Sequence, residues 1–232
     1  MITLRNANDR GHANFGWLDS QHTFSFGSYY DPQEMGFSRL RVINDDTVAP
    51  SAGFETHGHK NMEIISYVLQ GRIAHKDNAG NIKELPVDEF QIMSAGKGVL
   101  HSEFNASDKE TLKFLQIWIE PNVSGGQPDY QQKAFGNHHG LTPIITPDGR
   151  DGTLSIKQDA QLLQLILDEN KEEKLTLKPG RSLYIHQVEG RLTLSDGSVL
   201  TQGDGAKIRF EDAITLKNTG QYQAKALVFD LP

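Results

Sequence analysis

The 232-residue chain contains no cysteine. This absence excludes disulfides, thiolate metal ligands and thiol nucleophiles, so any metal ion must be bound through nitrogen and oxygen atoms alone. No apolar run approaches the ~20 residues needed to span a bilayer, which excludes a transmembrane helix. The first residues, Met1–Asp9, lack the basic-then-apolar pattern of a signal peptide. We therefore expect a cytoplasmic protein with no membrane partner.

A surplus of positive charge is also absent. The chain carries 23 lysines and arginines against 30 aspartates and glutamates, a formal net charge of −7, and no basic run stands out. Surfaces that bind nucleic acid normally show a basic surplus. We therefore expect no direct contact with nucleic acid.

Helical periodicity is scarce as well. Short alternating runs are punctuated by glycine, asparagine, aspartate and proline, a pattern typical of an all-β sandwich or barrel. Phe37–Ile43 is predicted to be one such strand, and Asn44–Asp46 the turn after it. The segment Arg10–Pro32 is rich in aromatic residues and has no clean period, so we expect it to wrap the barrel with its aromatic side chains buried.

The second half of the chain repeats parts of the first half in weaker form. Val68–Ile73 is echoed by Gln187–Leu192, and Asp88–Ile92 is echoed by Asp204–Ile208. Tandem β units of this kind predict a duplicated barrel.

The clearest break in composition is Pro121–Pro128, which contains two glycines, an asparagine and a serine. We take it as the start of a crossover between the two β units. The predicted domains are an N-terminal metal-binding domain over residues 1–122, a crossover linker over 123–148 and a C-terminal domain without metal over 149–232.

Four residues of the first half are candidate ligands of one metal ion. His57 and His59 are written H-G-H, and His101 and Glu103 are written H-S-E. Residues two apart on a strand project from the same face. If the two strands face each other across a barrel, three imidazoles and a carboxylate converge on one cation. These ligand types suit Fe, Mn, Co, Ni, Cu or Zn and do not choose among them.

Either pair alone is weak evidence, because an H-x-H arises easily in a chain with nine histidines. The glycines around the pairs strengthen the prediction. Gly53 precedes the first pair, Gly71 ends the strand that begins near Glu63, and Gly96-Lys97-Gly98 lies just ahead of the second pair. Glycines at strand ends and tight bends are what a small closed barrel needs at its corners.

The other histidines favour structural roles. His12 and His22 are predicted to be hydrogen-bonded structural residues, and His186, alone in an apolar strand, a packed core residue. His138 and His139 are adjacent, so on an extended chain they point in opposite directions and do not share a metal. The second half contains no H-x-H and no H-x-E, which predicts a single metal site.

The glycine and histidine spacing resembles the two cupin motifs, although the first glycine-to-histidine gap is short, the closing gap is one residue longer, and Gly96 stands where proline is usual. More specifically, the whole chain resembles the pirin family, whose bacterial members include quercetin 2,3-dioxygenases. Gly58 also replaces a more frequent proline. The resemblance rests on Arg10–Ser20 (RGHANFGWLDS), His22–Phe26 (HTFSF), Tyr29–Pro32 (YYDP), Leu40–Asp46 (LRVINDD), Thr56–Glu63 (THGHKNME), Gln91–Gly98 (QIMSAGKG) and His101–Glu103 (HSE).

The resemblance implies a bicupin of two tandem antiparallel jelly-roll barrels with one divalent transition metal ion. Iron is expected first, with copper, nickel, cobalt, manganese and zinc as alternatives. The implied ligands are His57, His59, His101 and Glu103, with Glu63 outside the ligand set as a hydrogen-bond acceptor. His75 and Lys76 are weak candidates for the cavity rim.

The resemblance further implies that quercetin, a flavonol, reacts with O₂ and that its ring is cleaved with loss of CO. Glu103 has two roles open to it: a permanent ligand, or a general base that takes the proton from the substrate hydroxyl. The alternative function is a metal-dependent interaction protein, a transcriptional coregulator or a partner of a metabolic enzyme, because pirins in other settings are known as such. We expect a monomer.

Overall fold

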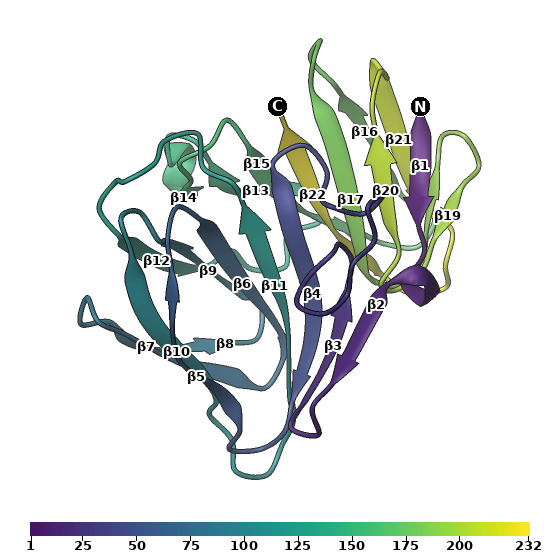
Figure 1. Cartoon of the computed structure of the whole chain (residues 1–232). Helices are drawn as coiled ribbons and strands as arrows, with labels where there is room; N and C mark the ends of the chain where they lie inside the picture. The colour runs from purple at the N-terminus through teal and green to yellow at the C-terminus, as the bar shows by residue number, and fades with distance from the viewer. The chain divides into compact units, whose positions relative to one another are not determined.

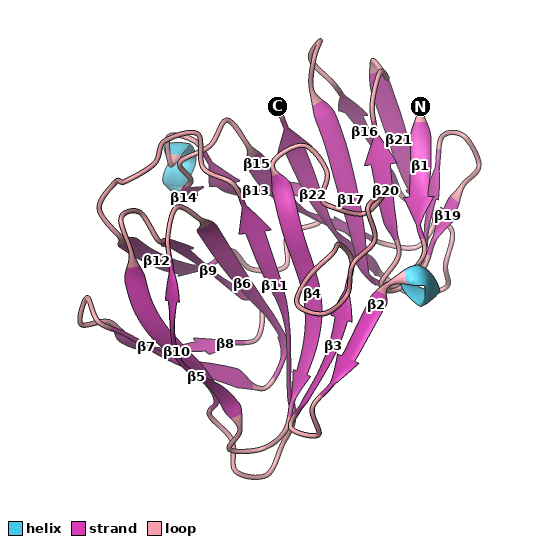
Figure 2. Ribbon diagram, viewed as in Figure 1, coloured by secondary structure: helices cyan, strands magenta, loops and turns pink.

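The computed structural model describes residues 1–232 and consists almost entirely of strands (Figures 1 and 2). The helical segments are two short 3-10 turns, η1 (Ala7–Asp9) and η2 (Arg150–Gly152). No helix has the length and apolar character that crossing a membrane requires. The predicted all-β class is confirmed.

The chain forms two compact units. The first unit comprises Gly11–Gly136 with Leu154–Gln158, and the second comprises Met1–Arg10, Asn137–Thr153 and Asp159–Pro232. The predicted crossover linker 123–148 contains strands of both units. The domain limits at residues 122 and 149 stay a prediction.

The first unit contains two antiparallel sheets, in the strand orders β12-β9-β6-β11-β4-β3-β2 and β5-β10-β7-β8. A short strand, β14 (Leu154–Ser155), returns to this unit, where the Ser155 amide donates to Gln131 Oε1 of β12 at 2.9 Å. The other strands are β2 (Gly11–Asn14), β3 (Leu18–His22), β4 (Leu40–Val48), β5 (Gly53–His59), β6 (Glu63–Gln70), β7 (Arg72–Asp77), β8 (Ile82–Pro86), β9 (Glu89–Ser94), β10 (Val99–Asn105), β11 (Leu112–Ile119) and β12 (Asp129–Ala134).

Strand β4 is longer than the sequence predicted. The predicted turn Asn44–Asp46 lies inside β4, where Asn44 pairs with Gln116 of β11 and with His22 of β3. Asparagine and aspartate favour turns when their side chains meet solvent or the local backbone. Here the side chains of Asn44 and Asp46 are buried against a cavity. The turn prediction is wrong for that reason.

Buried apolar side chains hold the first unit together. β6 lies between β9 and β11 and is almost continuously apolar, as a strand covered on both faces should be. Burying each large side chain stabilises the fold by roughly 1.5–3 kcal/mol. One cluster contains Leu18, Val48, Val68, Ile73, Leu85, Leu112 and Phe114, and another contains Ile64, Met93, Ala95 and Val99.

The second unit also contains two antiparallel sheets, in the orders β1-β20-β17-β22-β15-β13 and β16-β21-β18-β19. Fifteen buried apolar residues, among them Leu165, Ile185 and Val228, form its core. Its strands are β1 (Ile2–Arg5), β13 (Gly140–Thr146), β15 (Gln161–Leu167), β16 (Glu172–Thr176), β17 (Ser182–Glu189), β18 (Leu192–Leu194), β19 (Val199–Leu200), β20 (Gly205–Ile208), β21 (Ala213–Asn218) and β22 (Ala224–Leu231).

The two units repeat one topology strand by strand. The order β9-β6-β11-β4 recurs as β20-β17-β22-β15, and β5-β10-β7-β8 recurs as β16-β21-β18-β19. The hydrogen bonds that hold one loop are also repeated. The Asn105 side-chain amide at the end of β10 donates to the carbonyls of Ala49 and Glu110. The Asn218 side-chain amide at the end of β21 likewise donates to two backbone carbonyls. The tandem duplication predicted from the sequence is confirmed.

The glycine bend between β9 and β10 requires glycine at two positions. Gly96 has φ +49° and Gly98 has φ +142°, conformations that residues with a Cβ rarely adopt. A Cβ atom on Gly96 would also overlap the carbonyl group of Gly126. The bend therefore fixes where β10, with His101 and Glu103, begins.

We expect Gly96→Ala to lower the free energy of unfolding by about 2 kcal/mol more than Gly80→Ala does. Gly80 is a matched control because its φ is also positive, at +96°, but open space surrounds it. Denaturant unfolding of both variants measures the difference. Equal losses would show that the contact with Gly126 does not constrain the bend.

Candidate metal centre

The candidate ligands lie on two hydrogen-bonded neighbours, not on strands that face each other across a barrel. β5 and β10 pair antiparallel, with His57 opposite His101 and His59 opposite Val99. Directly opposite side chains on one face have Cβ atoms only ~4.5–5.5 Å apart, so adjacent strands bring imidazoles together more closely than opposing walls would. The sequence showed the two pairs but not this register.

The imidazoles of His57, His59 and His101 lie close together. One ring nitrogen of each residue lies within 4.8 Å of those of the other two, and the Nε2 atoms of His57 and His101 are 3.1 Å apart. Two nitrogens that each lie about 2.1 Å from one ion, at right angles, are about 3.0 Å apart. The observed spacing therefore fits two ligands of a single ion.

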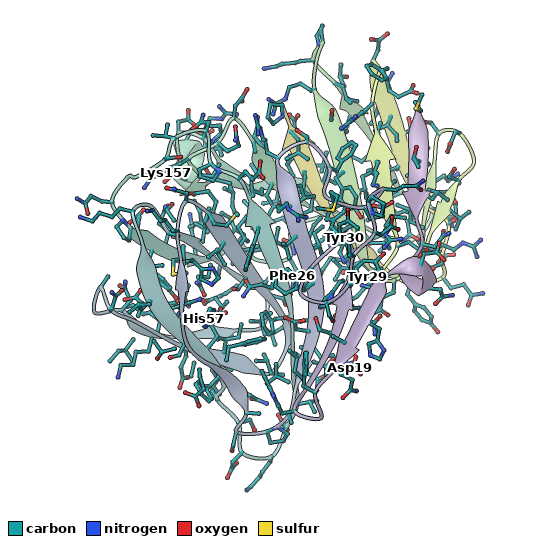
Figure 3. All side chains as sticks on the ribbon, in the orientation of Figure 1. Asp19, Phe26, Tyr29, Tyr30, His57 and Lys157 are labelled. Atoms are coloured by element: carbon teal, nitrogen blue, oxygen red, sulfur yellow. The ribbon has the colours of Figure 1, made fainter.

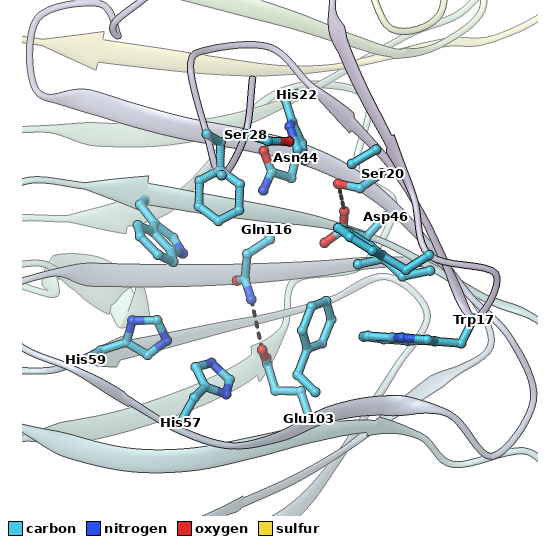
Figure 4. A pocket seen from close by; sticks show the side chains of 17 residues that line it. Trp17, Ser20, His22, Ser28, Asn44, Asp46, His57, His59, Glu103 and Gln116 are labelled. Carbon is cyan, nitrogen blue, oxygen red and sulfur yellow. Dashed lines mark hydrogen bonds between the residues drawn. The ribbon is translucent and has the colours of Figure 1, made fainter. Parts of the chain in front are cut away.

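Glu103 belongs to the cluster because its carboxylate lies near the His101 ring. The register of β10 against β5 shifts between these two residues, and the Glu103 carboxylate is buried. The Ser66 hydroxyl donates to Glu103 Oε1 at 3.2 Å, and Gln116 Nε2 donates to Oε2 at 2.8 Å (Figure 4). These two donors fix the direction in which the carboxylate points.

Burial keeps the imidazoles of His59 and His101 neutral. It lowers the pKa of His59 to about 4 and that of His101 to about 3, and the neighbouring His57 lowers both further. Burial raises the pKa of Glu103, while His75 and His57 lower it. Neutral imidazoles with lone pairs and a carboxylate that a cation would keep ionised are the donor set that a divalent metal requires.

His75 is a cluster member that sequence reasoning underrated. It was a weak candidate for the cavity rim, but it is 1% exposed, and its ring centroid lies 5.4 Å from that of His101. Its donor atoms lie within 4.8 Å of those of His101 and Glu103, and its Nε2 lies 3.2 Å from Asp77 Oδ2. The pairing of β7 with β10, which sets His75 opposite Glu103, is a long-range contact with no signature in the local sequence.

Glu63 has a structural role as a hydrogen-bond acceptor. Its buried carboxylate accepts hydrogen bonds from the Ser94 hydroxyl at 2.8 Å and from the Lys157 amide at 3.2 Å. It therefore ties the returning segment 154–158 to the start of β6. This is the hydrogen-bond acceptor role that the sequence predicted.

Most of the remaining histidines have structural roles, and His22 is the exception. His12 lies 3.1 Å from an Asp19 carboxylate oxygen, and His186 is buried in the second unit, as predicted. His139 pairs with Asp168 at 2.8 Å. His22 differs from its prediction, because its buried Nδ1 has no hydrogen-bond partner and its ring lines a cavity of the first unit.

That cavity has a volume of about 440 Å³, and His57 and His59 are among the residues that line it. The segment that was expected to wrap the barrel supplies Trp17 and Phe26, and β5 supplies Phe54 (Figure 3 labels Phe26 and His57). Trp17 and Phe54 meet edge to face at 5.2 Å, as do Phe26 and Trp118 at 5.4 Å. The walls are therefore aromatic, with the donor cluster at one end.

The pirin family model matches residues 3–119, and the model of the quercetinase C-terminal cupin domain matches residues 143–231. The chain belongs to the pirin family. The bicupin fold inferred from the family resemblance is confirmed with it.

Similarity to individual pirin relatives extends over the full length. The chain is 47% identical to a quercetin 2,3-dioxygenase of Escherichia coli K12, covering 100% of this chain and 99% of the relative. It is 40% identical to a putative quercetin 2,3-dioxygenase of Pasteurella multocida, with full coverage of both. The crystal structure of Escherichia coli YhhW matches with a TM-score of 0.97 at 46% identity, covering 100% and 98%.

A second Escherichia coli structure is that of the pirin YhhW in complex with nickel(II). It matches with a TM-score of 0.96 at 46% identity and covers 100% of this chain and 99% of that one. Together with the histidine and glutamate cluster, this complex indicates a divalent metal ion in the present protein without fixing which metal it is.

Asp46 has an unusual environment in the cavity wall. It is 3% exposed, and the Ser20 hydroxyl donates to its Oδ1. Burial, with smaller contributions from Asp45 and Glu103, raises the pKa of Asp46 to about 7, and the Ser20 hydrogen bond opposes that rise. The folded state therefore binds a proton at this carboxyl over a pH range in which the unfolded chain has lost it.

Because the folded-state pKa of Asp46 is raised, stability should fall as pH rises from about 4 to 7. Asp46→Asn removes this dependence, while its amide oxygen can still accept from Ser20. We expect the free energy of unfolding of the variant, minus that of the parent, to increase by on the order of 2 kcal/mol from pH 4.5 to pH 8. Denaturant unfolding of chelator-treated protein at both pH values measures this, and a pH-independent difference would contradict the assignment.

Proposed function

We propose that the protein is a metal-dependent quercetin 2,3-dioxygenase, which cleaves the flavonol with O₂ and releases CO. The ion would be held by His57, His59, His101 and Glu103. The observation that carries the proposal is the position of this cluster at one end of an aromatic-walled cavity. The relatives named quercetin 2,3-dioxygenase support it.

The cavity suits a flat aromatic guest. Its volume of about 440 Å³ lies within the ~300–1,000 Å³ typical of small-molecule sites. Trp17, Phe54, Phe26 and Trp118 offer ring faces and edges to such a guest.

The ion, when bound, supplies Lewis-acid stabilisation of a deprotonated substrate hydroxyl. In this proposal Glu103 takes the proton from that hydroxyl, a role supported by a carboxylate that lies in the cluster and lines the cavity. Ser66 and Gln116 hold the carboxylate in place while it gains the proton. Both atoms of O₂ are then incorporated into the opened product as CO leaves.

Metal-loaded protein incubated with quercetin in air should consume the flavonol and release CO. Loss of flavonol absorbance and CO detection provide the measurement, with iron, copper, nickel, cobalt, manganese and zinc loaded in turn. Chelator-treated protein is the control. No turnover with any metal would overturn the proposal and favour the metal-dependent interaction protein instead.

Glu103→Gln should abolish turnover, because glutamine fills the same space but does not accept the proton. The matched control is Glu63→Gln, a second buried carboxyl outside the donor cluster, which should keep turnover within about tenfold of the parent. Metal content and circular dichroism of both variants separate a lost base from a lost ligand or a lost fold. Retained turnover in Glu103→Gln would remove the base role.

A further inference from the structure

The cavity has a polar end remote from the candidate metal ligands. Its floor is one face of the sheet formed by β3, β4 and β11, where side chains two apart point the same way. Ser20 lies opposite Asp46, and His22 lies opposite Asn44, which in turn faces Gln116 of β11. Figure 4 shows Ser20, His22, Asn44 and Asp46 grouped away from His57 and His59.

The register gives an approximate distance between the two ends. Gln116 contacts Glu103 at 2.8 Å and stands opposite Asn44. The Cβ atoms of opposite residues are ~5 Å apart, and Asp46 lies a further ~7 Å along β4. The donor cluster and Asp46 are therefore separated by on the order of 10 Å, a span that suits a flat molecule of several fused or linked rings.

Polar atoms at this end lack partners within the protein. His22 Nδ1 and Asn44 Oδ1 have no hydrogen-bond partner, and both residues are more than nine-tenths buried. The side chain of Asp46 has Ser20 as its hydrogen-bond partner, through one oxygen only. Buried polar groups are almost always paired, so several incompletely paired groups around one cavity end indicate that a guest or a water completes them.

Two rows of rings start at the donor cluster, and one of them reaches the polar end at His22. One row runs from His57 to Phe54 and Trp17, with centroid distances of 6.3 and 5.2 Å. The other runs from His59 through Trp118 and Phe26 to His22, with distances of 5.0, 5.4 and 5.2 Å. The space between the two ends is therefore apolar and aromatic.

We propose that Asn44 and Asp46, with Ser20 and His22, recognise a hydroxyl group on the ring of the substrate that lies farthest from the metal-binding oxygens. This inference rests on the proposed flavonol chemistry and deepens it: the substrate class is a polyhydroxylated flavonol with polar groups at both ends. A phenolic hydroxyl both donates and accepts, which matches a carboxyl and an amide oxygen beside an imidazole. The raised pKa of Asp46 supports this, because a carboxyl that is partly protonated near neutral pH can serve either partner role.

The test compares quercetin with 3-hydroxyflavone. Both carry the 3-hydroxyl and 4-carbonyl groups, but only quercetin has hydroxyls on the remote rings. The chain's two tryptophans, Trp17 and Trp118, both line the cavity, so quenching of their fluorescence under anaerobic conditions reports occupancy of metal-loaded protein. The parent should bind quercetin at least 10-fold more tightly than 3-hydroxyflavone.

Asp46→Leu and Asn44→Leu should each reduce that preference to within about threefold, by weakening quercetin binding while leaving 3-hydroxyflavone binding nearly unchanged. The kcat/KM values for the two flavonols should follow the same pattern. The control is Asp45→Asn, the intervening residue of β4, which is not part of the cavity lining and should keep the full preference.

The outcomes separate the two proposals. If neither flavonol binds to or is turned over by the parent, the proposed function fails. If both flavonols bind with equal affinity to the parent, or if the two leucine variants keep the parent's preference, the polar end only holds water and this inference fails while the dioxygenase proposal stands.

Discussion

The donor cluster depends on the antiparallel pairing of β5 with β10. Because His57 lies directly opposite His101, the backbone hydrogen bonds of the ladder set the distance between two imidazoles without further support. A slip of one residue in either strand would turn the histidine of that strand to the other face of the sheet, away from its partner. The register shift before Glu103 then adjusts the carboxylate separately, and the strained bend at Gly96 determines where β10 enters.

The features that could be predicted from the sequence are those that depend on residues close together in the chain. The two histidine pairs, the glycines at the bends and the repeat around Gly71 and Gly190 all depend on residue type and short spacing. The glycines and the repeat led to correct expectations about the fold, whereas the histidine pairs lie on neighbouring strands and not on the facing strands that were expected. His75, which the sequence analysis underrated, and the polar group around Asp46, which it missed, depend on which strands become neighbours. Asn44 and Asp46 even have the composition of a turn, and only a cavity beneath them explains polar residues within a strand.

The duplicated unit shows which features belong to the fold and which to the site. The asparagine that ties the loop after β10 has its counterpart after β21, and Gly71 and Gly190 occupy matching turns with φ of +80° and +75°. The strands that correspond to β5 and β10, however, read EEKLT and AITLKN and contain no histidine. Architecture is therefore retained in both copies, whereas the histidine and glutamate cluster lies in the first.

The location of β1 affects when the second unit can complete its fold during translation. Ile2–Arg5 are translated long before their partners in the ladder, Gly205–Ile208. Throughout that interval β1 lacks its partner strand, while the intervening residues can already collapse into the first unit. Conversely, β20 has a bare backbone edge until this strand arrives, and unpaired edges attract other chains. Vectorial synthesis thus leaves the second unit open until the two distant segments of the polypeptide meet.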